Sequence, residues 1–139
     1  MSNEIIELAH SGINAYNKAN WDAVTTLMSA DIVYDEVATH RKITGHDDVI
    51  TAWKGWRAAF PDSSGEITSS RSDGDTAIIE IRWTGKHTGP MMTPNGEIPA
   101  TNKDINLRAI QVTKVADGKI AHQTHYFCMA TMMTQLGLA

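Results

Sequence analysis

The chain of 139 residues contains one cysteine, no long apolar run and fewer basic than acidic side chains. A single cysteine cannot close a disulfide within the chain or build a cysteine-based zinc site, and it is compatible with a reducing cytoplasm, where we expect the protein. The 12 basic against 16 acidic side chains give a net charge of −4. We therefore expect no nucleic-acid partner, because phosphate binding requires a concentrated basic face.

Signals for export, membranes and phosphate binding are missing as well. The first residues carry no basic region, and no segment is apolar over the length of a bilayer, so we expect no membrane partner. The chain has no glycine-rich phosphate loop and no G-x-S-x-G motif. An apolar content of 42% with 20% charged residues is typical of globular proteins. We expect one domain over residues 1–139, large enough to enclose a ligand-sized pocket.

Apolar residues recur at helical spacing in the first half of the chain. They predict an amphipathic helix over residues 4–19 and a short helix over 21–28, whose first turn Asn20 can cap. A third helix is predicted over residues 46–60, with Pro61 ending it.

Strand patterns dominate the rest of the chain. The predicted strands cover residues 32–34, 66–72, 76–84, 106–116 and 119–128. Asp73-Gly74 and Asp117-Gly118 predict two-residue hairpin turns, and residues 88–103, with three of the four prolines, predict a surface loop. Helices followed by a mostly antiparallel sheet indicate an α+β fold.

The second hairpin can be given a register from its turn. A two-residue loop pairs Ala116 with Lys119, and counting outward fixes the later pairs. One face then carries Leu107 opposite Cys128, Ala109 opposite Tyr126, Gln111 opposite Thr124 and Thr113 opposite His122. The other face carries Ile110 opposite His125 and Arg108 opposite Phe127. A bulge would exchange the faces beyond it.

Two adjacent carboxylates follow the first predicted strand. Asp35 and Glu36 point to opposite faces of a strand, so at most one of them faces inward. A carboxylate in an apolar pocket would have a raised pKa and could act as a base near neutral pH. The alternative is two solvated acids at the end of a strand.

Several other side chains have both a structural and a functional interpretation. His122 and His125, three apart on a strand, face opposite ways, so we expect no metal site. His87, at the end of a strand, is either solvated or part of a site. Trp53 and Trp56 lie at helical spacing and either pack in the core or line a pocket. The methionines at 129, 132 and 133 indicate packing of the C-terminal tail or a subunit contact.

A family resemblance rests on motifs that span nearly the whole chain. The motifs are Trp83-Thr84-Gly85-Lys86-His87-Thr88-Gly89, Pro99-Ala100-Thr101-Asn102-Lys103, Asp117-Gly118-Lys119-Ile120, His125-Tyr126-Phe127 and Gln135-Leu136-Gly137. With the order of helices, they resemble the SnoaL-like polyketide cyclase family of the nuclear transport factor two-like superfamily. The resemblance implies a curved sheet wrapped around helices in a cone, an apolar pocket, and a homodimer or homotetramer. It also implies cofactor-free aldol ring closure in which a carboxylate acts as acid and base.

The resemblance also assigns roles to particular positions. The cyclases' catalytic aspartate falls on Cys128, and a thiol is a poor substitute for a carboxylate. The catalytic aspartate of the related ketosteroid isomerases falls on Glu36, while their oxyanion tyrosine falls on Gly12. Tyr16, one helical turn further along, could partly replace that tyrosine.

Two classes of function follow from these residues. The first is an enzyme that needs no cofactor and removes a proton next to a carbonyl of a small apolar or polyketide-like substrate. Its base would be Glu36, or Cys128 assisted by His125. Tyr16, Gln111 or Tyr126 would donate a hydrogen bond to the enolate, with Trp53 and His87 also contacting the substrate. The alternative is a non-catalytic binding or assembly module, and dehydration or epoxide opening on the same scaffold is a further option.

Overall fold

A computed structural model of the protein describes residues 2–139, with side chains from Glu4 onward. The helices are α1 (Ser2–Asn17), α2 (Trp21–Leu27), α3 (His46–Ala59) and α4 (Met129–Gln135), with a 3-10 turn η1 (Val37–Thr39). The strands are β1 (Met28–Glu36), β2 (Arg41–Thr44), β3 (Ser64–Asp73), β4 (Thr76–Lys86), β5 (Met91–Thr93), β6 (Gly96–Ile98), β7 (Asp104–Ala116) and β8 (Lys119–Phe127).

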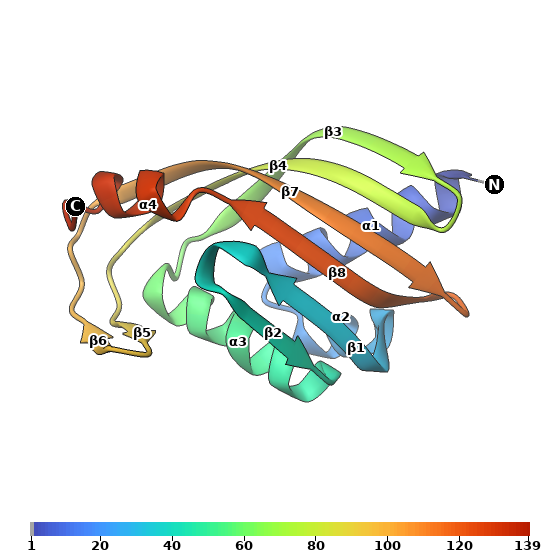
Figure 1. The fold of residues 1–139 in the computed structure, drawn as a ribbon, viewed down its shortest axis with the longest axis horizontal. Helices are drawn as coiled ribbons and strands as arrows, with labels where there is room; N and C mark the ends of the chain where they lie inside the picture. Colours follow the sequence, from blue (N-terminus) through green and yellow to red (C-terminus); the bar gives the residue numbers. More distant parts are fainter. Residues whose placement is uncertain (1) are drawn as a thin grey trace.

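A six-stranded sheet with the order β2-β1-β8-β7-β4-β3 forms the body of the molecule. Its described pairs are antiparallel except β1 with β8, and β5 and β6 form a separate hairpin. The sheet curves around the helices, with α1 against β3 and β4 and α3 against β1 (Figure 1). This architecture confirms the α+β fold predicted from the sequence.

The three N-terminal helices lie where the apolar spacing predicted them. Asn20 caps α2 by accepting a hydrogen bond from the backbone N–H of Ala23 at 3.2 Å. Helix α3 ends at Ala59, with Phe60 as its C-cap, just before Pro61. Helix α4 was not predicted as a helix, but its methionines do pack the tail: Met132 is buried in the core.

Three strands were missed because they are short or weakly patterned. Strand β2 has only four residues and begins with two charged ones, and β5 and β6 have three residues each inside the proline-containing segment predicted as a loop. Strand β1 starts at Met28, four residues earlier than predicted.

The turn of the second hairpin and its first pair, Ala116 with Lys119, are confirmed, and the register predicted beyond Val115 is wrong. Asp117 and Gly118 both have positive φ, at 52° and 73°, as a type I′ turn requires. The register shifts beyond Val115, where Ala121 is the extra residue of a bulge. Gln111 therefore pairs with His125 instead of Thr124. The other pairs change in the same way: Ala109 with Phe127, Ile110 with Tyr126, Thr113 with Gln123 and Lys114 with His122. In the first hairpin the turn is Gly74-Asp75, one residue later than predicted, because Asp73 pairs with Thr76.

The core consists of three groups of buried apolar side chains, and Trp83 of β4 packs against all three. One group lies between α1, α2, α3 and β1, the second near α4, and the third between α1 and β4. Trp83 thus connects the three groups of the core. Within the described residues, no helix is long and apolar enough to cross a bilayer.

Candidate functional site

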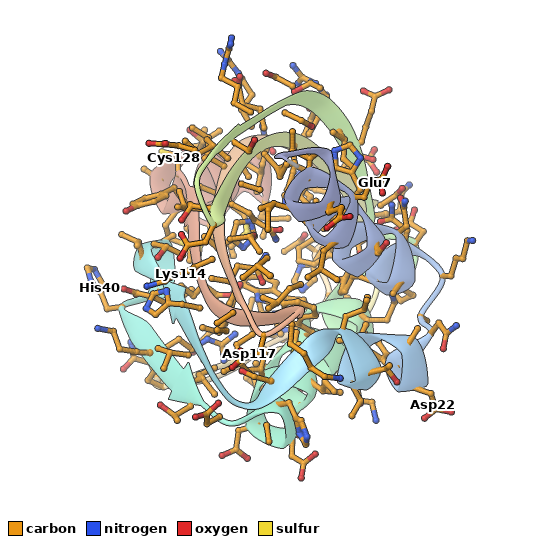
Figure 2. The ribbon with its side chains drawn as sticks, turned by 90° about the vertical axis from the view of Figure 1, so that its right-hand side faces the viewer. Glu7, Asp22, His40, Lys114, Asp117 and Cys128 are labelled. Atoms are coloured by element: carbon orange, nitrogen blue, oxygen red, sulfur yellow. The ribbon has the colours of Figure 1, made fainter. Side chains whose placement is uncertain are left out.

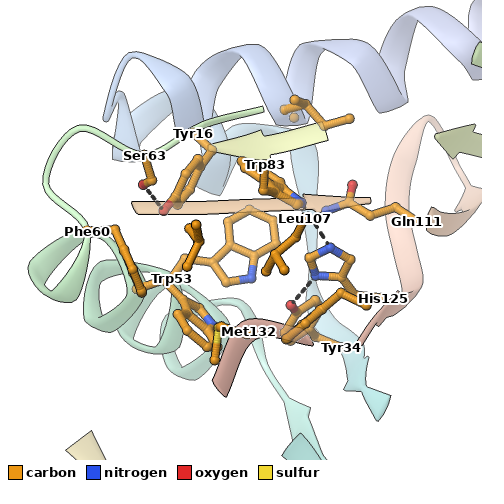
Figure 3. A pocket seen from close by; sticks show the side chains of 15 residues that line it. Tyr16, Tyr34, Trp53, Phe60, Ser63, Trp83, Leu107, Gln111, His125 and Met132 are labelled. Atoms are coloured by element: carbon orange, nitrogen blue, oxygen red, sulfur yellow. Dashed lines mark hydrogen bonds between the residues drawn. The ribbon is translucent and has the colours of Figure 1, made fainter. Parts of the chain in front are cut away.

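A pocket opens between the helices and the concave face of the sheet (Figure 3). It encloses about 690 Å³ of space not filled by atoms, including solvent at its mouth. Seven of its fifteen lining residues are Tyr, Trp or Phe: Tyr16, Tyr34, Trp53, Trp56, Phe60, Trp83 and Phe127. The polar side chains in the wall are few, which is typical of sites that bind small, largely apolar molecules.

His125 is the titratable imidazole in this wall, and β8 aims it inward because of the bulge at Ala121. Both ring nitrogens are hydrogen-bonded. Nδ1 lies 2.9 Å from the Tyr34 hydroxyl, and Nε2 accepts from the indole N–H of Trp83 at 3.2 Å. Burial lowers the pKa of His125 to about 4, although the negative charge of Glu36 acts to raise it. The ring is therefore neutral at neutral pH.

Glu36 is fully buried but does not line the pocket. Its Oε2 accepts from Tyr34 at 2.8 Å and from the indole of Trp56 at 2.9 Å. Its Oε1 accepts from Thr39 at 2.7 Å and from Arg41 at 2.9 Å. Burial alone would raise the pKa of Glu36, but these hydrogen bonds and the Arg41 charge together lower it. Of the two adjacent acids, Glu36 is thus the inward one, and Asp35 lies on the more exposed side, 4.0 Å from Lys42.

Tyr34 stands between these two residues. Burial, reinforced by the nearby charge of Glu36, raises the pKa of Tyr34 well above its ordinary value, so the hydroxyl stays protonated. It contacts Glu36 on one side and His125 on the other. A continuous chain of hydrogen bonds therefore runs from Trp83 through His125 and Tyr34 to Glu36.

A second polar pair lies across the pocket, where the Tyr16 hydroxyl is 2.8 Å from the Ser63 hydroxyl (Figure 3). One of the two donates to the other, which leaves one hydroxyl hydrogen for a ligand. Arg57 donates to the carbonyls of Tyr16 and Ser63, and its guanidinium lies 4.7 Å from the centre of the Tyr16 ring. Burial raises the pKa of Tyr16, so it too remains a donor.

Gln111 supplies a further polar group from β7. Its Oε1 accepts from Gln123 at 2.6 Å, and Gln123 also donates to Thr113 at 3.3 Å. These bonds hold the oxygen of Gln111 toward its strand neighbours. The amide nitrogen is left to face a ligand in the pocket that Gln111 lines.

Cys128, predicted at the catalytic position, lies outside the pocket. It is exposed, at the periphery of the molecule (Figure 2), and forms the N-cap of α4, with Sγ 3.4 Å from the backbone nitrogen of Thr131. Hydrogen bonds from Thr131 lower its pKa. Strand β8 ends at Phe127, and because His125 and Phe127 face inward, alternation along the strand directs Cys128 away from the pocket.

Two further predicted contact residues also lie away from the pocket. The bulge turns Tyr126 to the outer face, where it is 47% exposed beside Ile110. His87 is fully buried in the segment after β4, against Phe60, and its Nδ1 accepts from the backbone N–H of Thr101 at 3.2 Å. Burial lowers the pKa of His87. Tyr16, Trp53, Gln111 and His125 line the pocket, and His125 does so because the bulge reverses the face that the predicted register gave it.

Sequence reasoning missed the roles of Tyr34 and Trp83. Strand alternation carried a signal for both. Tyr34 and Glu36 are two apart on β1, and Trp83 is two from Ile81 on β4, so each follows the buried face of its strand. Among the described residues, no group of three His, Cys, Asp or Glu side chains is placed to hold a metal ion.

The fold and the pocket define the class of the protein. A curved, mostly antiparallel sheet around N-terminal helices is the nuclear transport factor two-like fold, also called ketosteroid isomerase-like. The chain belongs to the SnoaL-like polyketide cyclase family, whose profile matches residues 7–136. No curated protein shows significant sequence similarity to it.

Solved structures share the fold at low sequence identity. TsrD from Streptomyces laurentii has a TM-score of 0.84 at 19% identity, covering 100% of this chain and 98% of its own. A protein from Jannaschia sp. CCS1 described as a SnoaL-like polyketide cyclase has a TM-score of 0.89 at 15% identity, covering 99% and 94%. An LEH-like epoxide hydrolase from M. tuberculosis has a TM-score of 0.75 at 20% identity, covering 97% and 90%. At these identities the likeness extends to the fold alone.

Proposed function

We propose that the protein is an enzyme that needs no cofactor and removes a proton from carbon next to a carbonyl, in a small, largely apolar substrate. The single observation that carries this proposal is the pairing of Trp83 and His125 inside the aromatic pocket. A hydrogen-bond donor and a basic nitrogen stand side by side, 3.2 Å apart, and both face the pocket. To lose a proton from its α carbon, a ketone needs a hydrogen-bond donor at its carbonyl oxygen and a base at the α carbon.

The reaction begins when the substrate opens the Trp83–His125 hydrogen bond. The carbonyl oxygen accepts the indole N–H, and the freed Nε2 lone pair takes the α proton. The electrons of the broken C–H bond form the enolate, whose charge rests on the oxygen facing Trp83. The nitrogen of Gln111 and the free hydroxyl of the Tyr16–Ser63 pair supply further donors.

Two outcomes complete the cycle with atoms and charge in balance. When the substrate is a β,γ-unsaturated ketone, the enolate is a dienolate, and the imidazolium can return the proton to its γ carbon, which moves the double bond into conjugation with the carbonyl. Alternatively, the enolate carbon attacks a second carbonyl carbon of the same molecule, and the new carbon–carbon bond closes a ring. The imidazolium then protonates the resulting alkoxide. Both use His125 in the place that the family resemblance gave to Cys128, and neither requires Glu36 to touch the substrate.

A non-catalytic binding module is the second candidate, and it has an observation of its own. In the structure both nitrogens of His125 and both oxygens of Glu36 are already hydrogen-bonded within the protein. A ligand that leaves the Trp83–His125 bond closed would be held by the aromatic wall, Gln111 and the Tyr16–Ser63 pair, and would not react.

Proton abstraction from 5-nitrobenzisoxazole separates the two candidates. A base removes its carbon-bound proton while the N–O bond breaks, giving a coloured cyanonitrophenolate. Quenching of tryptophan fluorescence reports binding, because three of the four tryptophans line the pocket. We expect saturable turnover that falls about 100-fold or more in His125→Ala and survives in His122→Ala, the control on the same strand.

Binding without turnover faster than that of free imidazole would contradict the enzyme and favour the binding module. Turnover that survives in His125→Ala would contradict the assignment of the base. Exchange of the α protons of 1-tetralone with deuterium, followed by NMR, repeats the test on a ketone.

A further inference from the structure

We infer that Glu36 is a positioning residue that acts from outside the pocket: through Tyr34 it holds His125 in the tautomer with the proton on Nδ1. The hydrogen-bond chain carries this inference by itself, and only its kinetic consequence rests on the proposed function.

The direction of each hydrogen bond follows from the number of protons available. The Glu36 carboxylate, which the hydrogen bonds and Arg41 keep ionised, has no proton to give and only accepts. Tyr34 has one hydroxyl hydrogen, which therefore goes to Glu36 at 2.8 Å. The Tyr34 oxygen must then accept from His125 at 2.9 Å, so the proton of the ring sits on Nδ1.

The other ring nitrogen confirms the same direction. Trp83 has an indole N–H and no lone pair to offer, so Nε2 accepts at 3.2 Å and carries no proton. Two independent contacts thus point to one tautomer, and its lone pair faces the pocket. The opposite tautomer would set the N–H of Nε2 against the N–H of Trp83 and leave the ring without a basic nitrogen toward the substrate.

Glu36 also orients the pocket wall directly. The same Oε2 that accepts from Tyr34 accepts from Trp56 at 2.9 Å, and both donors line the pocket. Arg41 and Thr39 hold the other oxygen, so the carboxylate cannot rotate without breaking four hydrogen bonds. One buried acid therefore fixes two wall residues and, through one of them, the imidazole.

Breaking the link tests the inference without changing the size of the pocket. Tyr34→Phe keeps the ring and removes only the hydroxyl, and Glu36→Gln keeps the shape of the carboxylate but removes its charge. Asp35→Asn is the matched control, because it removes the neighbouring carboxylate on the more exposed side of the same strand. All three changes are small enough to leave the core packed.

Nitrogen-15 NMR of the histidine-labelled protein reads the tautomer directly, and His125→Asn assigns the signals. We expect Nδ1–H in the wild type and in Asp35→Asn, and a measurably smaller fraction of that tautomer in Tyr34→Phe and Glu36→Gln, in which only the Trp83 N–H still favours it. On 5-nitrobenzisoxazole we expect kcat to fall about tenfold or more in the latter two, with KM changing less than about threefold.

A wild-type ring protonated on Nε2, or an unchanged tautomer in Tyr34→Phe, would overturn the inference. So would an unchanged kcat in Tyr34→Phe and Glu36→Gln beside an active wild type. A wild type that does not turn the probe over counts against the proposed function, and the NMR measurement still decides the role of Glu36.

Discussion

The indole N–H of Trp83 donates to Nε2 of His125 at 3.2 Å, and this bond joins two strands that do not neighbour each other in the sheet. Strand β7 separates β4 from β8, so the two side chains meet above it on the concave side. Among the described contacts, the Trp83 indole N–H is the only donor to Nε2. This hydrogen bond is also the one that a substrate would have to open.

Replacing Trp83 by Phe tests what this bond does to the imidazole. The indole N–H stabilises the neutral ring and has nothing to offer the protonated one. We therefore expect the pKa of His125 to rise from about 4 in Trp83→Phe, by up to about one unit, which corresponds to about 1.4 kcal/mol. An NMR titration of His125 measures it. Trp53→Phe is the control, because it shortens another tryptophan of the same wall without removing a donor to His125. An equal rise in the pKa of His125 in Trp53→Phe would contradict the role of the hydrogen bond.

The buried imidazole should also make stability depend on pH. In the folded protein the pKa of His125 is about 4, against about 6.5 when unfolded, so between these values the unfolded chain binds a proton that the folded chain does not. The contribution of His125 to the free energy of unfolding is therefore complete above pH 6.5. It falls by about 3 kcal/mol in total as the pH falls toward 4.

Urea unfolding at several pH values measures this loss. His87, whose pKa burial also lowers, adds to the slope in the same direction, so the comparison must be between variants. We expect His125→Gln to flatten the slope between pH 6.5 and 5 and His122→Gln to leave it unchanged. An unchanged slope in His125→Gln would contradict a buried, neutral His125.

The sequence predicted local structure well where a short motif decides it. Asn20 capped a helix, Pro61 followed the end of one, and Asp117-Gly118 formed the expected turn. The face of β8 depended on something that no motif marks: one extra residue at Ala121. Because of this extra residue, His125 faces the pocket and Tyr126 faces outward, the reverse of the faces that the predicted register gave them.

The role of Glu36 could not be predicted from its position either. Alternation along β1 places it on the inner face, but whether an inward carboxylate reaches a substrate depends on its partners. Those partners come from η1, β2 and α3: Thr39, Arg41 and Trp56. Together they hydrogen-bond both oxygens, which favours the positioning role inferred above over that of a base.

A substitution at Cys128 tests whether this residue, which lies outside the pocket, takes part in turnover. Serine is a better N-cap than cysteine, since its hydroxyl accepts the backbone N–H of Thr131 more strongly than a thiol does at 3.4 Å. We expect Cys128→Ser to raise the Tm by about 2 °C and to leave turnover of 5-nitrobenzisoxazole unchanged. Thermal unfolding followed by circular dichroism, beside the colour assay, measures both. A loss of turnover in Cys128→Ser would return Cys128 to the catalytic site.

A glycine behind Trp83 sets the position of the indole. Gly65 of β3 pairs with Trp83, and a Cβ added there would lie 2.7 Å from the indole ring, closer than real contacts allow. The absent side chain therefore leaves the space in which the six-membered ring of the indole lies next to Gly65 while its N–H reaches His125. Gly65→Ala should push the indole away from the strand and break its hydrogen bond to Nε2.

The expected cost of Gly65→Ala is about 1–3 kcal/mol of unfolding free energy, together with weaker binding of the probe and a raised pKa of His125. Gly55→Ala is the matched control, because a Cβ at this exposed position of α3 meets nothing within 4 Å. That change should stabilise the protein by about 0.5–1 kcal/mol, since alanine favours the helix. Urea unfolding and the NMR titration of His125 measure the contrast. If Gly65→Ala left both the stability and the pKa of His125 unchanged, the indole would not depend on the space that the glycine leaves.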